Sequence, residues 1–403
     1  MQERKVADIL ASKSISIIDL VDTIVEESHV RHASDIHINP GHDAIRVRLR
    51  IDGVLQETHQ LPKDIHSEII SRIKVLAGMR TDEHQNTQDG RFRHHFKNGE
   101  TLDMRVSIAP TYQGENVVLR LLSDTAANYT LEMLGFSEAD RKKILTAIKR
   151  PHGMILSTGP TGSGKTTTLY TVIKMLNAPE VSIVTIEDPI EYAVEKVEQI
   201  QVNARVGLTF ANGLRSILRQ DPNIIMVGEI RDAETAAIAV NTALTGHLLL
   251  STLHTNDAAT TLPRLLDMGI DAYLVASTIN ISIGQRLVRK ICSHCKEKSV
   301  VTKSMEETLS TVPLKNLVKE GDVFYKGVGC EACGGSGYAG RLCISEVLVA
   351  DSAIREAIMR KASAAELRKI AIQGGMTTML EDGFAKARAG ETTIEEILRV
   401  VYE

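Results

Sequence analysis

The sequence is poor in aromatic residues and has no excess of positive charge. None of its 403 residues is Trp, only 3% are aromatic, and 47 Lys and Arg stand against 51 Asp and Glu. Proteins that bind nucleic acid usually combine a basic surface with aromatic stacking platforms. We therefore expect no nucleic-acid partner.

Long apolar runs are also missing. The longest, such as residues 224–227 and 248–250, soon end in polar residues, well short of the ~20 apolar residues that cross a bilayer. The first five residues, Met-Gln-Glu-Arg-Lys, are mostly charged and lead into no apolar signal-peptide segment. We expect no transmembrane segment and a cytoplasmic location, with membrane association only through partners.

Cysteine is scarce, and four of the five cysteines form two Cys-x-x-Cys pairs, Cys292 with Cys295 and Cys330 with Cys333. Disulfide frameworks are favoured in small secreted chains, whereas two such pairs supply four thiolates for a tetrahedral zinc ion. Four protein ligands leave no open coordination position, so we predict a structural Zn²⁺ site. Free core cysteines or a redox pair are the alternatives. Cys343 is expected to be an ordinary buried thiol.

At 403 residues the chain is expected to divide into two or three domains. Its first part shows a helical apolar period over residues 15–31 and alternating strand patterns at residues 45–51, 102–108 and 117–122. In the first of these strands the alternation puts three arginines on one face, which we expect to be solvated, before an Asp52-Gly53 turn. Since helix and strands cluster here, we predict an α+β domain over residues 1–123.

After a polar linker at residues 124–132, with a possible hinge at 123–130, apolar strands alternate with helices. This pattern is typical of an α/β domain with a mostly parallel sheet covered on both faces. We expect strands at residues 153–157, 182–187, 224–227 and 247–253. We expect helices after Lys165, around residues 211–219 and from Asp232, a plausible N-cap, to Leu244.

The remaining third of the chain divides at its glycines and cysteines. Residues 292–343 are rich in both and are interpreted as an insertion, whereas helical periodicity returns from Ser352. We therefore predict a P-loop domain over residues 133–403 that includes a zinc-binding module at 288–345 and a helical subdomain at 346–403.

One segment between a predicted strand and a predicted helix is a complete phosphate-binding loop. Its glycines let backbone N–H groups point at phosphate oxygens, and the helix that follows adds its N-terminal dipole. Lys165 would reach the β and γ phosphates, and the Thr166 hydroxyl would bind Mg²⁺. The predicted nucleotide-binding residues are Gly159, Pro160, Thr161, Gly162, Ser163, Gly164, Lys165, Thr166 and Thr167.

Polar side chains should follow three other strands beside this loop, because ligands of such sheets bind at the carboxyl ends of the strands. They belong to residues 187–189, 228–229 and 254–256. A carboxylate there can orient or activate the attacking water in phosphoryl transfer. Glu229 is our candidate for the base and Glu187 for the second carboxylate. For either one the alternative is a strand-end cap or an ion pair with Arg231.

The runs at residues 159–167, 185–191, 218–222, 227–232 and 245–256 resemble the Walker A, Asp, Walker B and His boxes of the secretion ATPases, the hexameric motors of type II secretion and type IV pilus assembly. The runs at residues 33–38, 50–55 and 114–122 resemble the domain that precedes their ATPase core. The resemblance covers nearly the whole chain. It implies a RecA-like P-loop core behind a smaller α+β, PAS-like domain, with ATP as the nucleotide.

The resemblance also implies roles for several cations. Arg105 and Arg120 match positions from which the family's amino-terminal domain is thought to reach nucleotide. Arg215, Arg219 and Arg231 match arginines that line the site or the subunit boundary, and we favour Arg105, Arg120 and Arg231. The alternative is that these side chains are solvated or form weak ion pairs.

Two histidines, His247 and His254, fall in the His box, where the family points one histidine toward the γ phosphate. A structural role is the alternative, above all for His247. Gly228 stands where other P-loop enzymes have a magnesium-orienting Asp, and the family shows the same substitution. Mg²⁺ would then be held chiefly by Thr166 and water.

Taken together, the resemblance implies a homo-hexameric motor at the cytoplasmic face of the inner membrane. It would hydrolyse Mg-ATP between its two domains and act on an inner-membrane platform protein. The cysteine module is typical of secretion and pilus-extension motors and is generally absent from retraction motors. Family members usually carry further amino-terminal domains, and this sequence begins almost at the second. A nucleic-acid translocase and a nucleotide-binding scaffold without turnover are the alternative functions.

Overall fold

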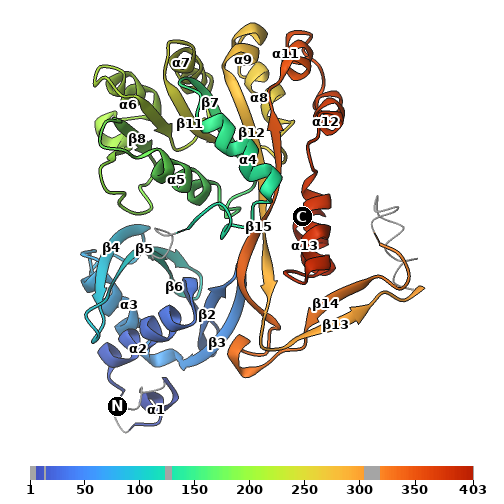
Figure 1. The fold of residues 1–403 in the computed structure, drawn as a ribbon. Coiled ribbons are helices and arrows are strands. Elements are labelled where there is room, and N and C mark those ends of the chain that lie inside the picture. Colours follow the sequence, from blue (N-terminus) through green and yellow to red (C-terminus); the bar gives the residue numbers. More distant parts are fainter. Residues whose placement is uncertain (1–5, 13–14, 123–128, 304–317, 403) are drawn as a thin grey trace. The chain divides into compact units, whose positions relative to one another are not determined.

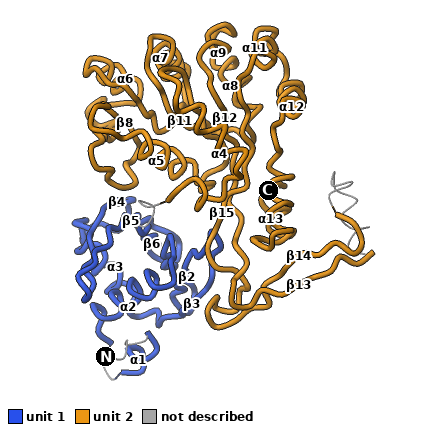
Figure 2. The backbone as a smooth tube through the Cα atoms, in the orientation of Figure 1, with its two compact units in different colours: residues 1–124 blue, residues 125–403 orange. Residues whose placement is uncertain are grey.

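The computed structural model describes residues 6–12, 15–122, 129–303 and 318–402 (Figure 1). The chain forms two compact units, residues 1–124 and 125–403, and each has its own apolar core (Figure 2). Its fold is α/β, with an antiparallel sheet in the first unit and a mixed sheet in the second. Most of the linker and hinge expected at 123–132 lies outside the described residues, which resume at Tyr129.

The first unit is built on a six-stranded antiparallel sheet in the order β3-β2-β1-β6-β5-β4. Its strands are β1 (Ala33–Pro40), β2 (Ala44–Ile51), β3 (Val54–Pro62), β4 (Gln88–His95), β5 (Thr101–Thr111) and β6 (Gly114–Leu122). Its helices are α1 (Val6–Leu10), α2 (Ile17–Val30), a 3₁₀ turn η1 (Lys63–Ile65) and α3 (His66–Leu76). The helix and the three strands expected here are present, and the structure adds β1, β3, β4 and α3.

The alternation expected in β2 decides which face of this sheet is covered. Ile45, Val47 and Leu49 are at most 1% exposed and belong to the same apolar core as α2 and α3. The arginines between and after them, at positions 46, 48 and 50, lie on the other face. The predicted turn follows, since Asp52 (φ 50°) and Gly53 (φ 86°) both take the left-handed conformation of a tight hairpin. The helices therefore leave the arginine face of the sheet uncovered within this unit.

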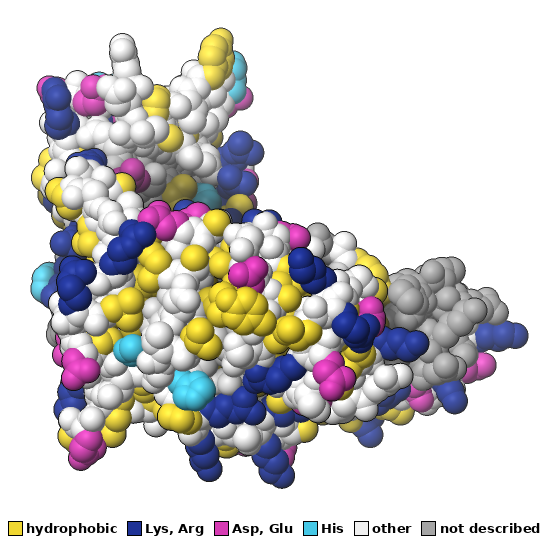
Figure 3. Space-filling view, turned by 90° about the horizontal axis from the view of Figure 1, so that it is seen from above, with side chains coloured by type: hydrophobic (Ala, Val, Ile, Leu, Met, Phe, Trp, Pro, Cys, Tyr) yellow, Lys and Arg dark blue, Asp and Glu magenta, His cyan; other side chains and the backbone are white. Residues whose placement is uncertain are grey.

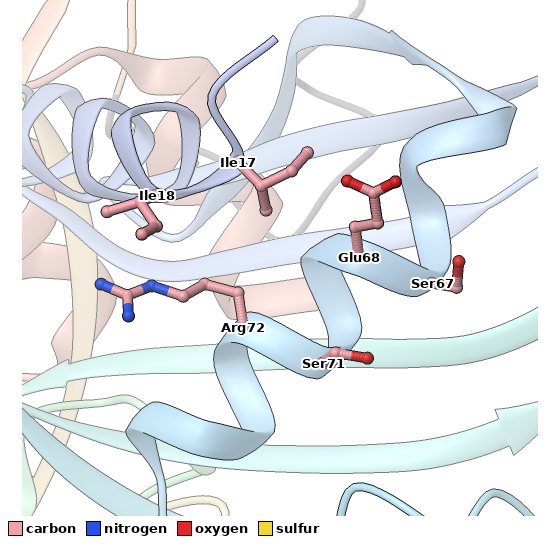
Figure 4. A pocket seen from close by; sticks show the side chains of 6 residues that line it. All are labelled: Ile17, Ile18, Ser67, Glu68, Ser71 and Arg72. Atoms are coloured by element: carbon pink, nitrogen blue, oxygen red, sulfur yellow. The ribbon is translucent and has the colours of Figure 1, made fainter.

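An open pocket lies between α2 and α3, with apolar residues on one side and polar residues on the other (Figure 4). It is lined by Ile17, Ile18, Ser67, Glu68, Ser71 and Arg72. Because these helices cover the aliphatic face, the pocket and the three arginines of β2 are on opposite sides of the sheet.

The second unit is built on a seven-stranded sheet in the order β15-β12-β7-β11-β10-β8-β9. Neighbouring strands are parallel except for β12 and β15. The strands are β7 (Gly153–Thr158), β8 (Ile183–Glu187), β9 (Glu198–Gln201), β10 (Ile224–Val227), β11 (Leu248–Leu253), β12 (Ile279–Ile291) and β15 (Tyr338–Val349). The four predicted strands match β7, β8, β10 and β11.

Helices cover both faces of this sheet, each over its own apolar cluster (Figure 1). One cluster includes residues of α4 (Glu138–Ile148) and α5 (Lys165–Leu176). The other includes residues of α6 (Phe210–Ile217), α7 (Ala233–Leu244), α8 (Thr261–Asp267), α9 (Ala272–Thr278), α11 (Ser352–Met359) and α12 (Ala364–Gln373). A 3₁₀ turn, η3 (Ala204–Val206), precedes α6. The predicted N-cap of α7 is confirmed, because Asp232 Oδ1 accepts a hydrogen bond of 2.7 Å from Thr235 N.

Of the residues interpreted as an insertion, 292–343, the last six belong to β15 and therefore to the main sheet. β12 and β15 are 13 and 12 residues long and pair along most of their length as part of the main sheet. Only the segment between them leaves the sheet, as the two-stranded ribbon β13 (Lys296–Val300) and β14 (Val323–Gly327) with the 3₁₀ turn η4 (Glu331–Cys333). Since β15 reaches Val349, the helical tail begins at Ser352 and not at residue 346. It continues through α13 (Met379–Ala389) and α14 (Ile394–Tyr402).

Seen from above, hydrophobic side chains gather on the surface of the second unit among charges of both signs (Figure 3). Exposed large hydrophobic residues near the amino ends of the parallel strands include Leu244, Tyr273 and Met359, which are 47%, 57% and 54% exposed. This surface lies at the end of the sheet opposite to the phosphate loop, so it is not part of the nucleotide site.

Candidate functional site

Four parallel strands, β7, β8, β10 and β11, bring the predicted site segments to one edge of the sheet. The phosphate loop follows β7 and Glu187 is the last residue of β8. Glu229 lies two residues beyond β10, and His254 directly follows β11. The carboxyl edge of the sheet therefore carries the loop, both candidate carboxylates and one histidine.

The phosphate loop has the backbone that its glycines permit. Gly159, Gly162 and Gly164 have positive φ angles of 143°, 78° and 88°. At Gly159 a Cβ atom would also lie 2.3 Å from the carbonyl oxygen of Gln285, so only glycine fits. The loop then turns into α5, whose first residue is Lys165.

Lys165 points into its own loop. Its side chain is buried, and Nζ donates hydrogen bonds of 2.9 Å to the carbonyl oxygens of Gly159 and Pro160. Burial lowers the pKa of this ammonium, and the nearby Glu229 carboxylate opposes that shift. The ammonium is thus positioned where the loop would enclose phosphate oxygens.

Sequence reasoning missed Gln285 of β12, which supports the loop from the neighbouring strand. This side chain is 1% exposed. Its Nε2 donates to the carbonyl oxygen of Ser163 at 2.8 Å, and its Oε1 accepts from the Ser157 hydroxyl at 3.2 Å. No motif marks Gln285, because its partners lie more than 120 residues away and β12 itself was not predicted.

Glu229 is held between a guanidinium and an imidazole at the edge of the sheet. Its Oε1 lies 2.6 Å from Arg231 Nη2, and its Oε2 lies 3.0 Å from His254 Nε2. The Glu229 side chain is 11% exposed, whereas those of Arg231 and His254 are 64% and 48% exposed. The hydrogen bond to Glu229 raises the pKa of Arg231. The ion pair that the sequence left as an alternative is therefore present, and it orients the carboxylate without enclosing it.

Glu187 has a different environment, although it ends the neighbouring strand. It is 2% exposed. Its carboxylate accepts hydrogen bonds from the Tyr170 hydroxyl, from Thr185 Oγ1 at 2.6 Å and from Gln199 Nε2 at 3.2 Å. Burial raises the pKa of Glu187, and these hydrogen bonds oppose that shift in part. This carboxylate joins α5 to β8 and β9.

Gly228, which replaces the aspartate of other P-loop enzymes, fits a crowded position. A Cβ atom there would lie 3.3 Å from both the Ile186 carbonyl oxygen and the Glu187 Cα atom. Thr166 in the first turn of α5 is partly exposed, and its hydroxyl has no hydrogen-bond partner among the residues that the structure describes. Mg²⁺ accepts few protein ligands beside water and phosphate, so this one hydroxyl fits it.

The two histidines of the His box lie at opposite ends of β11. His254 contacts Glu229, whereas His247 precedes the strand, roughly 20 Å away at ~3.3 Å per residue. Nδ1 of His247 lies 3.2 Å from the Thr242 carbonyl oxygen, and the His247 carbonyl accepts from Gly153 N at 3.1 Å. The structural alternative for His247 therefore fits its position.

The remaining candidate arginines lie outside this cluster. Arg105 and Arg120 belong to the first unit and face each other across β5 and β6. Arg120 Nε donates to Asp35 Oδ1 at 3.1 Å, and Arg50 Nε lies 3.3 Å from Asp35 Oδ2, so this arginine face is more than a solvated surface.

In the second unit, Arg215 of α6 and Arg219, which follows this helix, contact residues close to them. Arg215 pairs with Glu234 at 2.7 Å, and Arg219 donates to the Arg215 carbonyl oxygen and the Ser216 hydroxyl. These contacts give neither arginine a place beside Glu229.

The four paired cysteines form a separate centre at the base of the β13–β14 ribbon. Their sulfur atoms all lie within 4.8 Å of one another, and three of the pairs are 3.7 to 3.9 Å apart. A tetrahedral zinc ion with ~2.3 Å bonds requires sulfur atoms about 3.8 Å apart, so the geometry fits that metal. Cys343 lies apart on β15, 1% exposed, and burial raises the pKa of its thiol to about 12, as expected for a buried thiol.

No helix within the described ranges is long and apolar enough to cross a membrane.

Comparison with known proteins gives consistent matches over the length of the chain. A family model described as type II/IV secretion system protein matches residues 11–399. The chain is 47% identical over 391 residues to the type II secretion system protein E of Xanthomonas campestris pv. campestris, covering 97% of this chain and 68% of that protein. It is 46% identical over 379 residues to the type IV pilus assembly ATPase PilB of Thermus thermophilus, covering 94% of this chain and 42% of that protein.

Among solved structures, the pilus retraction motor PilT with bound ADP resembles this chain. The TM-score is 0.63 at 26% sequence identity, covering 94% of this chain and 96% of that chain. A motor that was solved with bound ADP therefore shares the fold over most of this chain.

Proposed function

The chain belongs to the type II/IV secretion system protein family, a family of ATPases, and from this premise we propose that it is a motor that binds Mg-ATP at the carboxyl edge of its seven-stranded sheet. It uses the hydrolysis of ATP to drive type II protein secretion or type IV pilus assembly. The grouping of Lys165, Glu229 and His254 at one sheet edge carries this proposal. The names of the two relatives support the two alternatives for the work performed.

In this mechanism Lys165 exchanges the two loop carbonyls for oxygens of the β and γ phosphates. Glu229 accepts a proton from the attacking water while the bond between the γ phosphorus and the bridging oxygen breaks. His254 and Arg231 keep its carboxylate oriented. Thr166 would hold Mg²⁺, which neutralises charge on the phosphates.

The wider assembly is also part of the proposal. We infer a homo-hexamer at the cytoplasmic face of the inner membrane that acts on a platform protein. Three arginines supply positive charge to the phosphates. Arg105 and Arg120 come from the first unit, which is PAS-like, and Arg231 comes from the second, which is RecA-like.

The test of turnover is phosphate release by wild type and by Glu229→Gln. Glu138→Gln is the control, because Glu138 is an exposed glutamate whose pairs with Arg141 and Lys142 lie on α4, away from the site. We expect Glu229→Gln to lower kcat roughly 100-fold or more with nucleotide binding retained, and the control to match wild type. Equal turnover by all three proteins would remove Glu229 from its role. Stimulation of turnover by DNA or RNA would favour a translocase instead.

The cysteine centre is proposed to hold structural Zn²⁺, which fixes the β13–β14 ribbon to β12 and β15. We expect about one zinc ion per chain by elemental mass spectrometry, at the four-thiolate stoichiometry. Cys330→Ser should lose the metal, whereas Cys343→Ser should keep it. Full zinc content in Cys330→Ser would contradict the assignment.

A further inference from the structure

The loop that joins β11 to α8 carries His254 and is anchored at the phosphate edge of the sheet. His254 Nε2 lies 3.0 Å from the Glu229 carboxylate. The next residue, Thr255, is fixed to Thr158 at the end of β7: its N–H donates to the Thr158 hydroxyl at 3.1 Å, and the two hydroxyl oxygens are 2.5 Å apart. Both contacts position the beginning of the loop.

The end of this loop is held by Glu346, a residue of β15 that belongs to no motif identified in the sequence. Its side chain is fully buried. Oε1 accepts a hydrogen bond of 2.9 Å from Ala258 N. Oε2 accepts from Arg368 Nη2 of α12 and from Met379 N, the first residue of α13, each at 3.4 Å. A single carboxylate therefore joins the histidine loop to two helices of the C-terminal tail.

The neighbouring strand is shaped to admit this contact. Gly284 of β12 lies opposite Glu346 in the strand register. A Cβ atom on Gly284 would lie 2.9 Å from Ala258 N and 3.0 Å from Glu346 Cγ, closer than ordinary contacts. Any larger residue would thus press on the bond between the loop and the carboxylate.

A carboxylate is a costly group to bury, and an aliphatic side chain would fill this space without that cost. A glutamate provides two acceptor oxygens on one rigid planar group. They satisfy an N–H of the loop on one side and, on the other, the guanidinium of α12 and the first N–H of α13. Glu346 therefore fixes the position of the loop that carries His254 relative to α12 and α13.

We propose that Glu346 is a positioning residue for ATP hydrolysis. It holds residues 254–258 so that His254 meets Glu229, and it ties this loop to α12 and α13, so that a displacement of these helices reaches the catalytic carboxylate. This inference rests on the proposed function, in which Glu229 is the base.

The test compares kcat, KM and the dissociation constant of ADP for wild type, Glu346→Ala, Glu346→Gln and Gly284→Ala. Glu346→Ala should lower kcat roughly 10- to 100-fold by misplacing the loop, while the ADP dissociation constant stays near that of wild type because the phosphate loop is unchanged. Glu346→Gln should recover most of kcat, since its amide oxygen still accepts from Ala258 N. Gly284→Ala should lower kcat without any change of charge.

A double-mutant cycle separates positioning from a loss of stability. In a His254→Ala background, Glu346→Ala should change kcat little further, because the contact that it positions is already gone. Glu396→Gln is the matched control, since the Glu396 side chain is also buried but binds Arg289 near the far end of β12 and Arg399 of α14. It should lower the melting temperature and leave kcat unchanged.

Several outcomes would overturn the inference. Additive losses in the cycle would overturn it, as would a kcat loss in Glu346→Ala that Glu396→Gln matches at equal stability. If Glu346→Ala does not fold, unchanged kcat in both Glu346→Gln and Gly284→Ala would overturn it as well. Wild-type kcat in Glu229→Gln would remove the base and with it the ground of both proposals, whereas dependence on Glu229 with unaffected Glu346 variants would reject only the positioning role.

Discussion

Glu229 and Glu187 follow neighbouring strands at one edge of the same sheet, yet their surroundings are opposite. Glu229 is bound by a guanidinium and an imidazole whose side chains are 64% and 48% exposed. Glu187 is bound by two hydroxyls and an amide, and it is 2% exposed. The position at a strand end brings a carboxylate near the nucleotide, but its hydrogen-bond donors determine what it can do there.

The difference assigns separate tasks to the two residues. Under the proposed function, the partners of Glu229 remain in contact with solvent and can move when nucleotide binds, which leaves its carboxylate able to take a proton. The donors to Glu187 come from α5, β8 and β9, so this carboxylate fixes the helix that begins with Lys165. There are thus two hypotheses for Glu187. It is either a second catalytic carboxylate, as we predicted from the sequence, or an anchor for α5.

The largest expected effect distinguishes these hypotheses through activity. Under the anchor hypothesis, Glu187→Gln should lower kcat by less than about tenfold, against the roughly 100-fold or greater loss expected for Glu229→Gln. The reason is that an amide oxygen in place of Oε1 still accepts from Thr185 and Gln199, whereas an amide in place of Glu229 cannot accept a proton. Steady-state phosphate release measures both values.

A 100-fold loss of kcat in Glu187→Gln, at unchanged melting temperature, would restore Glu187 to the catalytic pair. The matched control is Glu396→Gln, another buried carboxylate of the second unit, whose arginine partners lie away from the phosphate edge. It should show wild-type turnover.

The sequence predicts this edge of the sheet well, for a physical reason. The phosphate loop is a contiguous motif, and the buried parallel strands before each site segment are short and mostly apolar. The strand predicted at residues 224–227 coincides with β10, and those at 153–157 and 182–187 differ from β7 and β8 by one residue at one end.

The same reasoning fails at β12 and β15, because polar residues are buried there. Gln285 and Glu346 are at most 1% exposed and interrupt the apolar pattern of two long strands. Their partners, Ser163 and Ala258, are 122 and 88 residues away along the chain. These interruptions, which hid the strands, are the side chains that support the phosphate loop and the histidine loop.

An effect of intermediate size concerns the free energy of unfolding. For this quantity we expect a larger loss at the Glu187 site than at the Glu229 site, the reverse of the expected losses of kcat. Tyr170→Phe removes a buried donor from Glu187 and should cost about 1–3 kcal/mol of unfolding free energy. Arg231→Gln breaks an ion pair with a largely exposed partner and should cost under ~1 kcal/mol while lowering kcat. Urea denaturation followed by circular dichroism measures both. A smaller cost for Tyr170→Phe than for Arg231→Gln would contradict the anchor hypothesis.

The smallest expected effect is a dependence of stability on pH. Burial raises the pKa of Glu187 in the folded protein, so the folded state holds this proton more tightly than the unfolded chain. Its contribution to stability is therefore fully present below the ordinary glutamate pKa and is lost as pH rises through the raised value.

Glu396 provides the opposite case, because its contacts with Arg289 and Arg399 outweigh burial and lower its pKa to about 2. Its contribution is present above the ordinary glutamate pKa and is lost as pH falls toward about 2. The stability difference between wild type and Glu187→Gln should thus move in favour of wild type on acidification, and that for Glu396→Gln should move against it. Denaturation midpoints at about pH 4 and about pH 7 measure both shifts. Shifts of the same sign would contradict the prediction that neutral donors and arginines have opposite effects on the pH dependence of stability.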